Sequence, residues 1–305
     1  MRTFFSAVCT ALGALAVALG FICVANPHRP LFYLIDIFTL PILSVTAVLT
    51  ALFMLVRQPR AAALGTLATV LLIIAMAPQV FPKQAPADAN AKPVKLLWAN
   101  MFVRNATQEK LLPWVAAKNP DIVALVEVAP AQRKDMIDKL KIDYPYMAVR
   151  YDMIVASRYP IANAKPRPAG FALVTLTVKT PQGPLNLAVT HLTRPWPFTQ
   201  PKDQPRQFAR LADALMPLPD GRMVLVGDFN TTPSAALLHD FTGKLDLHTV
   251  PALNGTWESA LPSIGRVTID NVLATRDLNL SRRETGPANG SDHSPVYVEI
   301  RTAAR

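Results

Sequence analysis

"MVLVGDFNTTP", residues 223–233, combines the pattern of a buried strand with polar side chains at its end. The run is apolar and of strand type up to Gly227, and Asp228 and Asn230 follow at once. A short continuous apolar run is typical of a strand that is buried on both faces. The sequence therefore predicts a carboxylate and an amide at the edge of a buried sheet.

The residues around this stretch predict a layered α/β fold. Runs of strand type alternate with segments of helical spacing, yet several strands follow one another directly. This order favours mixed sheets in a layered sandwich over a parallel barrel. The predicted strands are 94–100, 121–128, 151–160, 171–180, 185–192, 222–230, 267–275 and 295–300, and the predicted helices are 106–119, 129–142 and 204–218.

Polar residues stand at the ends of most of these strands. The set is Asn100, Glu127, His191, Asp228, Asp270, Asp292 and His293. In a sandwich such ends can meet at one rim, which would bring carboxylates, an amide and two imidazoles together. Phosphate-ester hydrolysis needs such a set, because the anionic ester repels hydroxide and the developing charge must be neutralised while protons move. Carboxylate and amide oxygens favour Mg²⁺ or Mn²⁺ over zinc, and histidines titrate near neutral pH.

Five quoted motifs carry a resemblance to a known family. They are "WANM…N…NPDIVALVEV" (98–128), "THL" (190–192), "VGDFNTTP" (226–233), "TIDNVL" (268–273) and "GSDHSPVYVEI" (290–300). In this order, residues 94–301 resemble the endonuclease/exonuclease/phosphatase superfamily, which includes deoxyribonucleases, abasic-site endonucleases, inositol phosphatases and neutral sphingomyelinases. The resemblance implies a four-layer α/β/β/α sandwich and metal-dependent hydrolysis of a phosphate ester.

The resemblance also implies which residues hold a metal. Asn100 and Glu127 look like the principal ligands of Mg²⁺ or Mn²⁺, and Asp292 would assist at the same or a second position. The chain departs from many relatives at Val126, where they have Gln, and at Asn271, where they have His. Neither departure removes a ligand or a proton carrier, so both bear on the class of substrate more than on activity.

Roles in catalysis follow from the same resemblance. Asp228 and Asn230 would orient or deprotonate the attacking water and hold the scissile phosphate. His191 matches the histidine that contacts the phosphate and can protonate the leaving oxygen. Asp270 and His293 look like a carboxylate and imidazole dyad, in which the acid fixes the tautomer of the ring. Either Asp228 or His293 could take the proton of the water.

Aromatic and basic residues flank the predicted site. Trp196 and Phe198 follow His191 in "TRPWPF" and could stack on a base, enter lipid or only pack the loop. Trp257 is expected in a loop at the rim. Arg194 and Arg266 are possible phosphate contacts, although isolated arginines are usually only solvated.

The N-terminal part is far more apolar than the rest. The whole chain is 51% hydrophobic and has a formal charge of +10, but segments 4–25 and 61–81 contain no charged residue and 31–56 contains only Asp36. Each segment can cross a bilayer of about 30 Å as a helix, so we expect three transmembrane helices. The first could instead be a cleaved signal peptide. Asp36 is either a functional acid at membrane depth or a residue at the membrane surface.

The segments define a domain order. Residues 1–81 are expected to form the membrane region, 82–93 an extended proline-containing linker, and 94–305 the catalytic domain. Arg and Lys in the short flanks place the N-terminus in the cytoplasm and the large domain on the other side, which we interpret as a bacterial periplasm behind the inner membrane. Both cysteines, Cys9 and Cys23, lie in the first apolar segment, so the large domain has neither disulfides nor a thiolate metal site.

The sequence thus predicts a membrane-anchored, Mg²⁺-dependent phosphodiesterase or phosphomonoesterase. Its substrate could be nucleic acid or a phospholipid, since the basic charge suits either and no motif reads bases. No obligate protein partner is evident. The alternative is a module that binds a phosphorylated ligand or lipid head group without turnover. Each site residue also has a purely local interpretation, because Asp228 could merely cap a turn. A transporter has little support in three short-looped helices.

Overall fold

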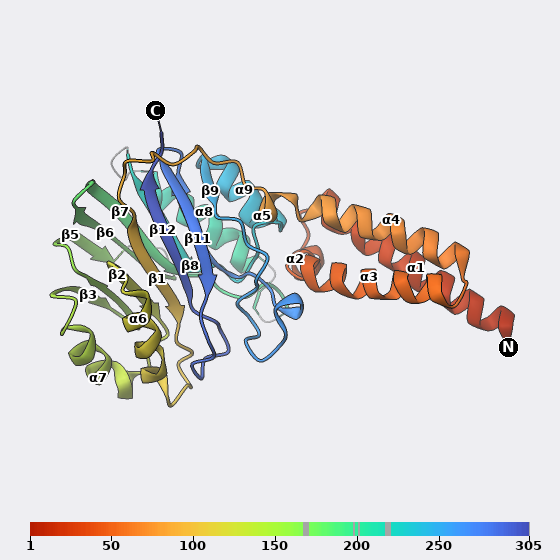
Figure 1. Ribbon diagram of the computed structural model, residues 1–305, viewed down its shortest axis with the longest axis horizontal. Helices are drawn as coiled ribbons and strands as arrows, with labels where there is room; N and C mark the ends of the chain where they lie inside the picture. The colour runs from red at the N-terminus through yellow and green to blue at the C-terminus, as the bar shows by residue number, and fades with distance from the viewer. Residues whose placement is uncertain (167–170, 198, 201, 217–220, 305) are drawn as a thin grey trace.

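The computed structural model describes residues 1–166, 171–197, 199–200, 202–216 and 221–304. Phe198, one of the two aromatic residues of the "TRPWPF" loop, lies outside these ranges. The described chain forms a sandwich of two β-sheets from which a bundle of N-terminal helices projects (Figure 1).

The first sheet has six strands in the order β11-β12-β1-β2-β4-β3. Its central strand β1 pairs parallel with β2 and antiparallel with β12, so the sheet is mixed. The strands are β1 (Val94–Asn100), β2 (Ile122–Val126), β3 (Tyr146–Arg150), β4 (Met153–Ser157), β11 (Leu278–Thr285) and β12 (Val296–Thr302).

The second sheet has six strands in the order β5-β6-β7-β8-β10-β9. Strands β7 and β8 pair in parallel, and β8 pairs antiparallel with β10. This register puts His191 and Asp270 on either side of Asp228. The strands are β5 (Ile161–Pro166), β6 (Ala172–Thr180), β7 (Gly183–His191), β8 (Met223–Asp228), β9 (Leu247–Thr249) and β10 (Asp270–Thr275).

Helices cover the outer face of each sheet. Alternation along β1 directs Leu96 and Trp98 into the core between the sheets and Leu97 onto the outer face. That outer face packs against α6 (Leu112–Lys118) and α7 (Pro130–Leu140), and the second sheet packs against α8 (Asp203–Leu215) and α9 (Ala236–Lys244). The four-layer α/β/β/α sandwich predicted from the sequence is therefore confirmed.

The N-terminal helices differ from the expectation of three straight spans. They are α1 (Arg2–Ala25), α2 (Pro30–Asp36), α3 (Thr39–Leu55), α4 (Pro59–Ala75) and α5 (Ala77–Val80). Only α1 is by itself long and apolar enough to cross a membrane among the described residues. The segment 31–56 is broken after α2, and α2 and α3, which could form one span together, meet at 63°. The helix α4 is apolar but has 17 residues.

The chain between the helices and the sandwich is held against the sandwich. Ala87 forms a bridge with Ala303, and the backbone N–H of Leu280 on β11 donates to Gln84 Oε1 at 3.0 Å. The amide of Gln182 donates to the carbonyl of Lys92 at 3.0 Å. Residues 82–93 are thus fixed to the sandwich at several points.

Candidate active site

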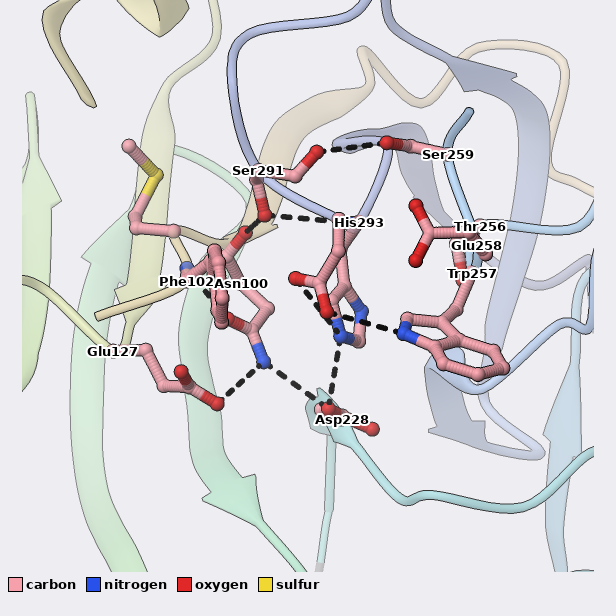
Figure 2. Close-up of polar contacts among 12 residues, drawn as sticks. Asn100, Phe102, Glu127, Asp228, Thr256, Trp257, Glu258, Ser259, Ser291 and His293 are labelled. Carbon is pink, nitrogen blue, oxygen red and sulfur yellow. Dashed lines mark hydrogen bonds and ion pairs between the residues drawn. The ribbon is translucent and has the colours of Figure 1, made fainter. Parts of the chain in front are cut away.

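Predicted polar residues of both sheets meet at one rim of the sandwich, and Figure 2 shows Asn100, Glu127, Asp228 and His293 together there. His191, Asp228 and Asp270 stand side by side at the ends of β7, β8 and β10. Asn100 ends β1, and Glu127 follows β2, its parallel neighbour. Parallel pairing brings equivalent ends of neighbouring strands to the same edge, and this places residues distant in sequence next to one another.

Asn100 joins the two sheets. Its amide Nδ2 donates to Glu127 Oε1 and to Asp228 Oδ2, each at 3.1 Å, as Figure 2 shows. Its Oδ1 accepts from the backbone N–H of Phe102 at 2.9 Å. Glu127 has a left-handed backbone with φ of 53°, an uncommon conformation that is often found at functional sites. Its Oε2 accepts from the N–H of Val103 at 3.1 Å.

Asp228 lies between two imidazoles. Its Oδ2 is 3.6 Å from His191 Nε2 and 3.7 Å from His293 Nε2, while its Oδ1 accepts from the backbone N–H of Asn230 at 2.8 Å. His191 Nε2 is also 3.5 Å from Glu127 Oε1. Burial raises the pKa of Asp228 above its ordinary value, against the opposing positive charges of His293 and His191. The side chain of His191 is 25% exposed and can therefore meet a ligand.

Asp270 and His293 form a buried dyad. Asp270 Oδ2 is 2.8 Å from His293 Nδ1, and Asp270 Oδ1 accepts from the indole N–H of Trp98 at 3.0 Å. Burial lowers the pKa of His293, but the charges of Asp270 and Asp228 outweigh it and raise that pKa to about 10. Burial likewise raises the pKa of Asp270, and here the charge of His293 and the hydrogen bonds prevail and lower it. The dyad therefore favours a carboxylate beside an imidazolium.

The donors available for a cation fit a hard divalent metal. Asp292 Oδ2 accepts from Trp257 Nε1 at 3.2 Å, but its Oδ1 is buried and has no hydrogen-bond partner among the described residues. A buried carboxylate oxygen without a partner is costly unless a cation or water satisfies it. Asp228, Asp270 and His293 also form a tight acidic and imidazole cluster. His293 Nδ1 in that cluster is already engaged by Asp270, so Asn100, Glu127 and Asp292 remain our candidates for the metal.

Two buried glutamines that the sequence analysis missed hold the loops of the site together. Gln108 Nε2 donates to the carbonyls of Met101, Phe102 and Glu127 at 3.0–3.1 Å, and thereby joins the loops after β1 and β2. Gln204 Nε2 does the same in the second sheet. It donates to the carbonyls of Thr193, Phe229 and Asn230 at 3.0–3.2 Å. Only their complete burial distinguishes them from ordinary helical glutamines, and the sequence does not reveal burial.

Other residues named from the sequence divide between the site and its supports. Asn230 lines the cavity, and its Nδ2 donates to the carbonyl of Leu192 at 2.8 Å. Arg194 lines the cavity and forms no ion pair with any residue that the structure describes. Asn271 is structural, because its amide donates to the carbonyls of Thr231 and Thr268.

Family comparison agrees with this geometry. A family model described as "Endonuclease/Exonuclease/phosphatase family" matches residues 97–293, more than half of the chain. The chain belongs to the endonuclease/exonuclease/phosphatase family. The resemblance drawn from the motifs is therefore confirmed. Members of this family are hydrolases that act on phosphodiester bonds.

Several solved structures share this fold at low sequence identity. A Danio rerio TDP2 structure complexed with a single-strand DNA product has a TM-score of 0.58 and 16% identity, covering 69% of this chain and 100% of its own. An endonuclease/exonuclease/phosphatase from Beutenbergia cavernae has a TM-score of 0.55 and 19% identity, covering 70% of this chain and 72% of its own. The human Nocturnin catalytic domain with a bound sulfate anion has a TM-score of 0.54 and 17% identity, covering 72% of this chain and 100% of its own. A comparison with curated proteins finds no match.

Proposed function

We propose that this protein hydrolyses a phosphate ester in a divalent-metal-dependent reaction while anchored in a membrane. The observation that carries the proposal is the position of Asp228 Oδ2, within 3.7 Å of the Nε2 atoms of both His191 and His293. A carboxylate flanked by two imidazoles at the base of a cavity can order a water and move its proton. A site for simple binding would not need this arrangement.

Asn100, Glu127 and Asp292 would hold the cation, which on the chemistry of their oxygens is Mg²⁺ or Mn²⁺. When bound, the cation supplies Lewis-acid neutralisation of charge on the phosphoryl oxygens. Asp292 Oδ1 supports this assignment, because it is buried without a hydrogen-bond partner among the described residues, with His293 Nε2 at 3.9 Å.

The remaining residues would handle water and protons. Asp228 orients the attacking water, and Asn230 and the guanidinium of Arg194 face the phosphate. His191, at the exposed side of Asp228, donates a proton to the leaving oxygen. Asp270 keeps the proton of His293 on Nδ1, so that His293 Nε2 faces Asp228 and the reacting phosphate.

The N-terminal helices would anchor the enzyme. The apolar α1 and the bent pair of α2 and α3 support at least one span and as many as two, and α4 would complete the three expected from hydropathy. The flanking Arg and Lys residues support a cytoplasmic N-terminus and a catalytic domain outside the cytoplasm, at a bacterial inner membrane.

The test is hydrolysis of bis-p-nitrophenyl phosphate by the full chain in detergent with Mg²⁺. We expect Asp228→Ala and His293→Ala to lower kcat at least about 100-fold. Asp246→Asn is the matched control, because Asp246 is an exposed acid paired with Arg276 away from the site. Equal rates in all four proteins would exclude catalysis at this site and would favour the alternative of a binding module.

A further inference from the structure

The cavity at the active site has one polar and one apolar wall. Glu127, His191 and Asp228 are among the polar residues. The apolar wall includes Leu34 of α2 and Ile37 of the turn before α3, together with the neighbouring Phe38. The cavity has a volume of about 300 Å³. In Figure 1, α2 lies at the junction between the sandwich and the N-terminal bundle, so the catalytic residues face chain that continues directly into α3.

Buried polar contacts hold this apolar wall in place. Asp36, the last residue of α2, is buried, and its Oδ2 accepts from the backbone N–H of Ala236 at the start of α9 at 3.0 Å. Gln79 of α5 is buried as well, and its amide donates to the carbonyl of Ala252 at 2.8 Å and to Thr268 Oγ1 at 3.2 Å. The helices are therefore fixed to the catalytic domain at two separate points. The apolar wall is held in a defined position beside the catalytic residues.

A loop of the catalytic domain extends toward the same helices with its apolar side chains uncovered. Ile264 is 63% exposed and Leu261 is 44% exposed. The hydroxyl of Ser44 on α3 donates to the carbonyl of Ile264 at 3.1 Å, which places this loop against α3. If α3 lies in the bilayer, these side chains lie at its surface, where apolar groups insert favourably. The apolar wall of the cavity, which continues into α3, then lies next to the membrane.

We infer that the substrate is a phosphate ester of a membrane lipid, with its phosphate among the catalytic residues and the start of its hydrocarbon chain against Leu34, Ile37 and Phe38. This inference rests on the proposed function. Water adds through its oxygen to phosphorus, the ester P–O bond breaks, and the leaving oxygen takes a proton, so that an alcohol and a phosphate product form. The chain of the lipid never needs to leave the apolar surroundings that lead to the bilayer.

A nucleic acid fits these walls less well. The aromatic rings of Phe102 and Trp257 also line the cavity and could stack on a base. A strand, however, needs a basic groove that follows its backbone on both sides of the reacting phosphate, and here one side is closed by α2 and the turn before α3. A nucleic acid is therefore the competing substrate in the experiment.

The experiment measures how the rate depends on chain length. Full-length protein, held in an amphipathic polymer instead of a detergent that could fill the cavity, receives methyl, butyl and octyl p-nitrophenyl phosphate with Mg²⁺. One buried methylene changes affinity about fourfold, so three or four methylenes against the apolar wall raise kcat/KM about 100-fold from methyl to octyl. The octyl-to-methyl ratio of kcat/KM is the quantity to compare.

Variants separate binding in the cavity from partition into the polymer. In the double variant Leu34→Ser and Phe38→Ser, we expect the ratio to fall below about 10, because the wall no longer holds the chain. Leu31→Ser is the matched control, since Leu31 lies on the same helix, is 52% exposed and does not line the cavity. It retains the ratio. Leu34→Trp, which fills the cavity instead of opening it, is a second variant that also lowers the ratio if the double variant does not fold.

Each possible result either supports or overturns the inference. A ratio of about 100 that is lost in the cavity variants and kept in Leu31→Ser supports the inference. A ratio near 1, a ratio that the cavity variants leave unchanged, or faster cleavage of a single-stranded oligonucleotide than of the octyl ester overturns it while leaving the proposed function intact. Absence of hydrolysis of every ester removes the proposed function and this inference with it.

Discussion

Replacing Asp270 by Asn tests the dyad with almost no change of shape. In the wild type both donors around Asp270 meet a carboxylate oxygen, Trp98 Nε1–H at 3.0 Å and His293 Nδ1 at 2.8 Å. An amide has one oxygen and one NH₂ group, so it can accept from only one of them. If its oxygen faces Trp98, its NH₂ faces His293 Nδ1 and forces the proton of the imidazole onto Nε2. If its oxygen faces His293, two donors face each other at Trp98.

The loss of activity in Asp270→Asn follows from this conflict between hydrogen-bond donors. With its proton on Nε2 the ring has the reversed tautomer, and the negative charge that stabilises the imidazolium of the wild type is gone. Wrong-tautomer substitutions of this type cost about 10⁴-fold in kcat, which is about 5 kcal/mol in the activation barrier. We expect Asp270→Asn to lower the hydrolysis of bis-p-nitrophenyl phosphate by about 10³–10⁴-fold, with KM changed little.

A second substitution makes the explanation specific. Trp98→Phe removes the competing donor, so in the double variant with Asp270→Asn the amide oxygen is free to turn to His293. We expect the double variant to be at least about 10-fold faster than Asp270→Asn alone, although Trp98→Phe by itself leaves a small cavity. Circular dichroism and thermal unfolding of each variant check the fold. Activity of Asp270→Asn within fivefold of wild type, or a double variant no faster than the single one, would refute the reasoning.

Three further predictions concern the metal, the sheet and pH. Glu127→Gln removes a carboxylate from the proposed metal site, and we expect the Mg²⁺ concentration for half-maximal activity to rise at least about 100-fold, measured by Mg²⁺ titration; an unchanged value would exclude Glu127 as a ligand. Gly227→Ala places a Cβ 2.3 Å from the carbonyl oxygen of Thr190 on the neighbouring strand. We therefore expect the free energy of unfolding to fall by about 1–3 kcal/mol. Thermal unfolding measures this loss, and an unshifted midpoint would contradict the prediction. Burial, assisted by the charge of Arg276, lowers the pKa of His248 from 6.5 to about 4, so the unfolded chain binds a proton that the folded chain does not between these values. Stability should therefore fall by about 1–3 kcal/mol as the pH decreases from 6.5 toward 4, and His248→Phe should reduce this fall; the same pH dependence in both proteins would show that His248 is not its cause.

The sequence predicted the strands that are mostly buried and apolar. β1, β2, β8 and β12 have this character because both of their faces are covered in the sandwich, although Lys95 of β1 and Glu299 and Arg301 of β12 interrupt the apolar pattern. β11 was missed, since "LNLSRRET" carries three charges and its residues from Ser281 onward are only half-buried or exposed at the edge of the sheet. The helix α9 was missed as well, because its nine residues give too short a periodic pattern.

Hydropathy did not predict the break in the second apolar segment. Residues 31–56 carry no charge apart from Asp36, and Pro41 lies in the first turn of α3, directly after the break at Ile37 and Phe38. Pro41 has no N–H to donate to the carbonyl of Ile37, so a continuous helix is interrupted there. The hydrogen bond from the backbone of Ala236 to Asp36 fixes the end of α2 to the sandwich. A sequence shows that Asp36 is polar in an apolar segment, but its partner comes from the fold.

For the site, the motifs placed the polar residues at strand ends, and the strand register then brought His191, Asp228 and Asp270 side by side. The supports could not be predicted. Trp98 had the pattern of an ordinary core residue, and Gln108 that of a surface residue on a helix. Their functions depend on the acceptors that they meet, Asp270 and the carbonyl of Glu127.

The central claim is that groups from separate strands form one metal-assisted centre for phosphate-ester hydrolysis. The most direct measurement is anomalous X-ray scattering from crystals of the full-length protein soaked in Mn²⁺. The account predicts a manganese peak at bonding distance, about 2.0–2.3 Å, from carboxylate oxygens of Glu127 and Asp292. Manganese bound only elsewhere on the molecule, with Glu127 and Asp292 still without a cation at saturating Mn²⁺, would contradict it.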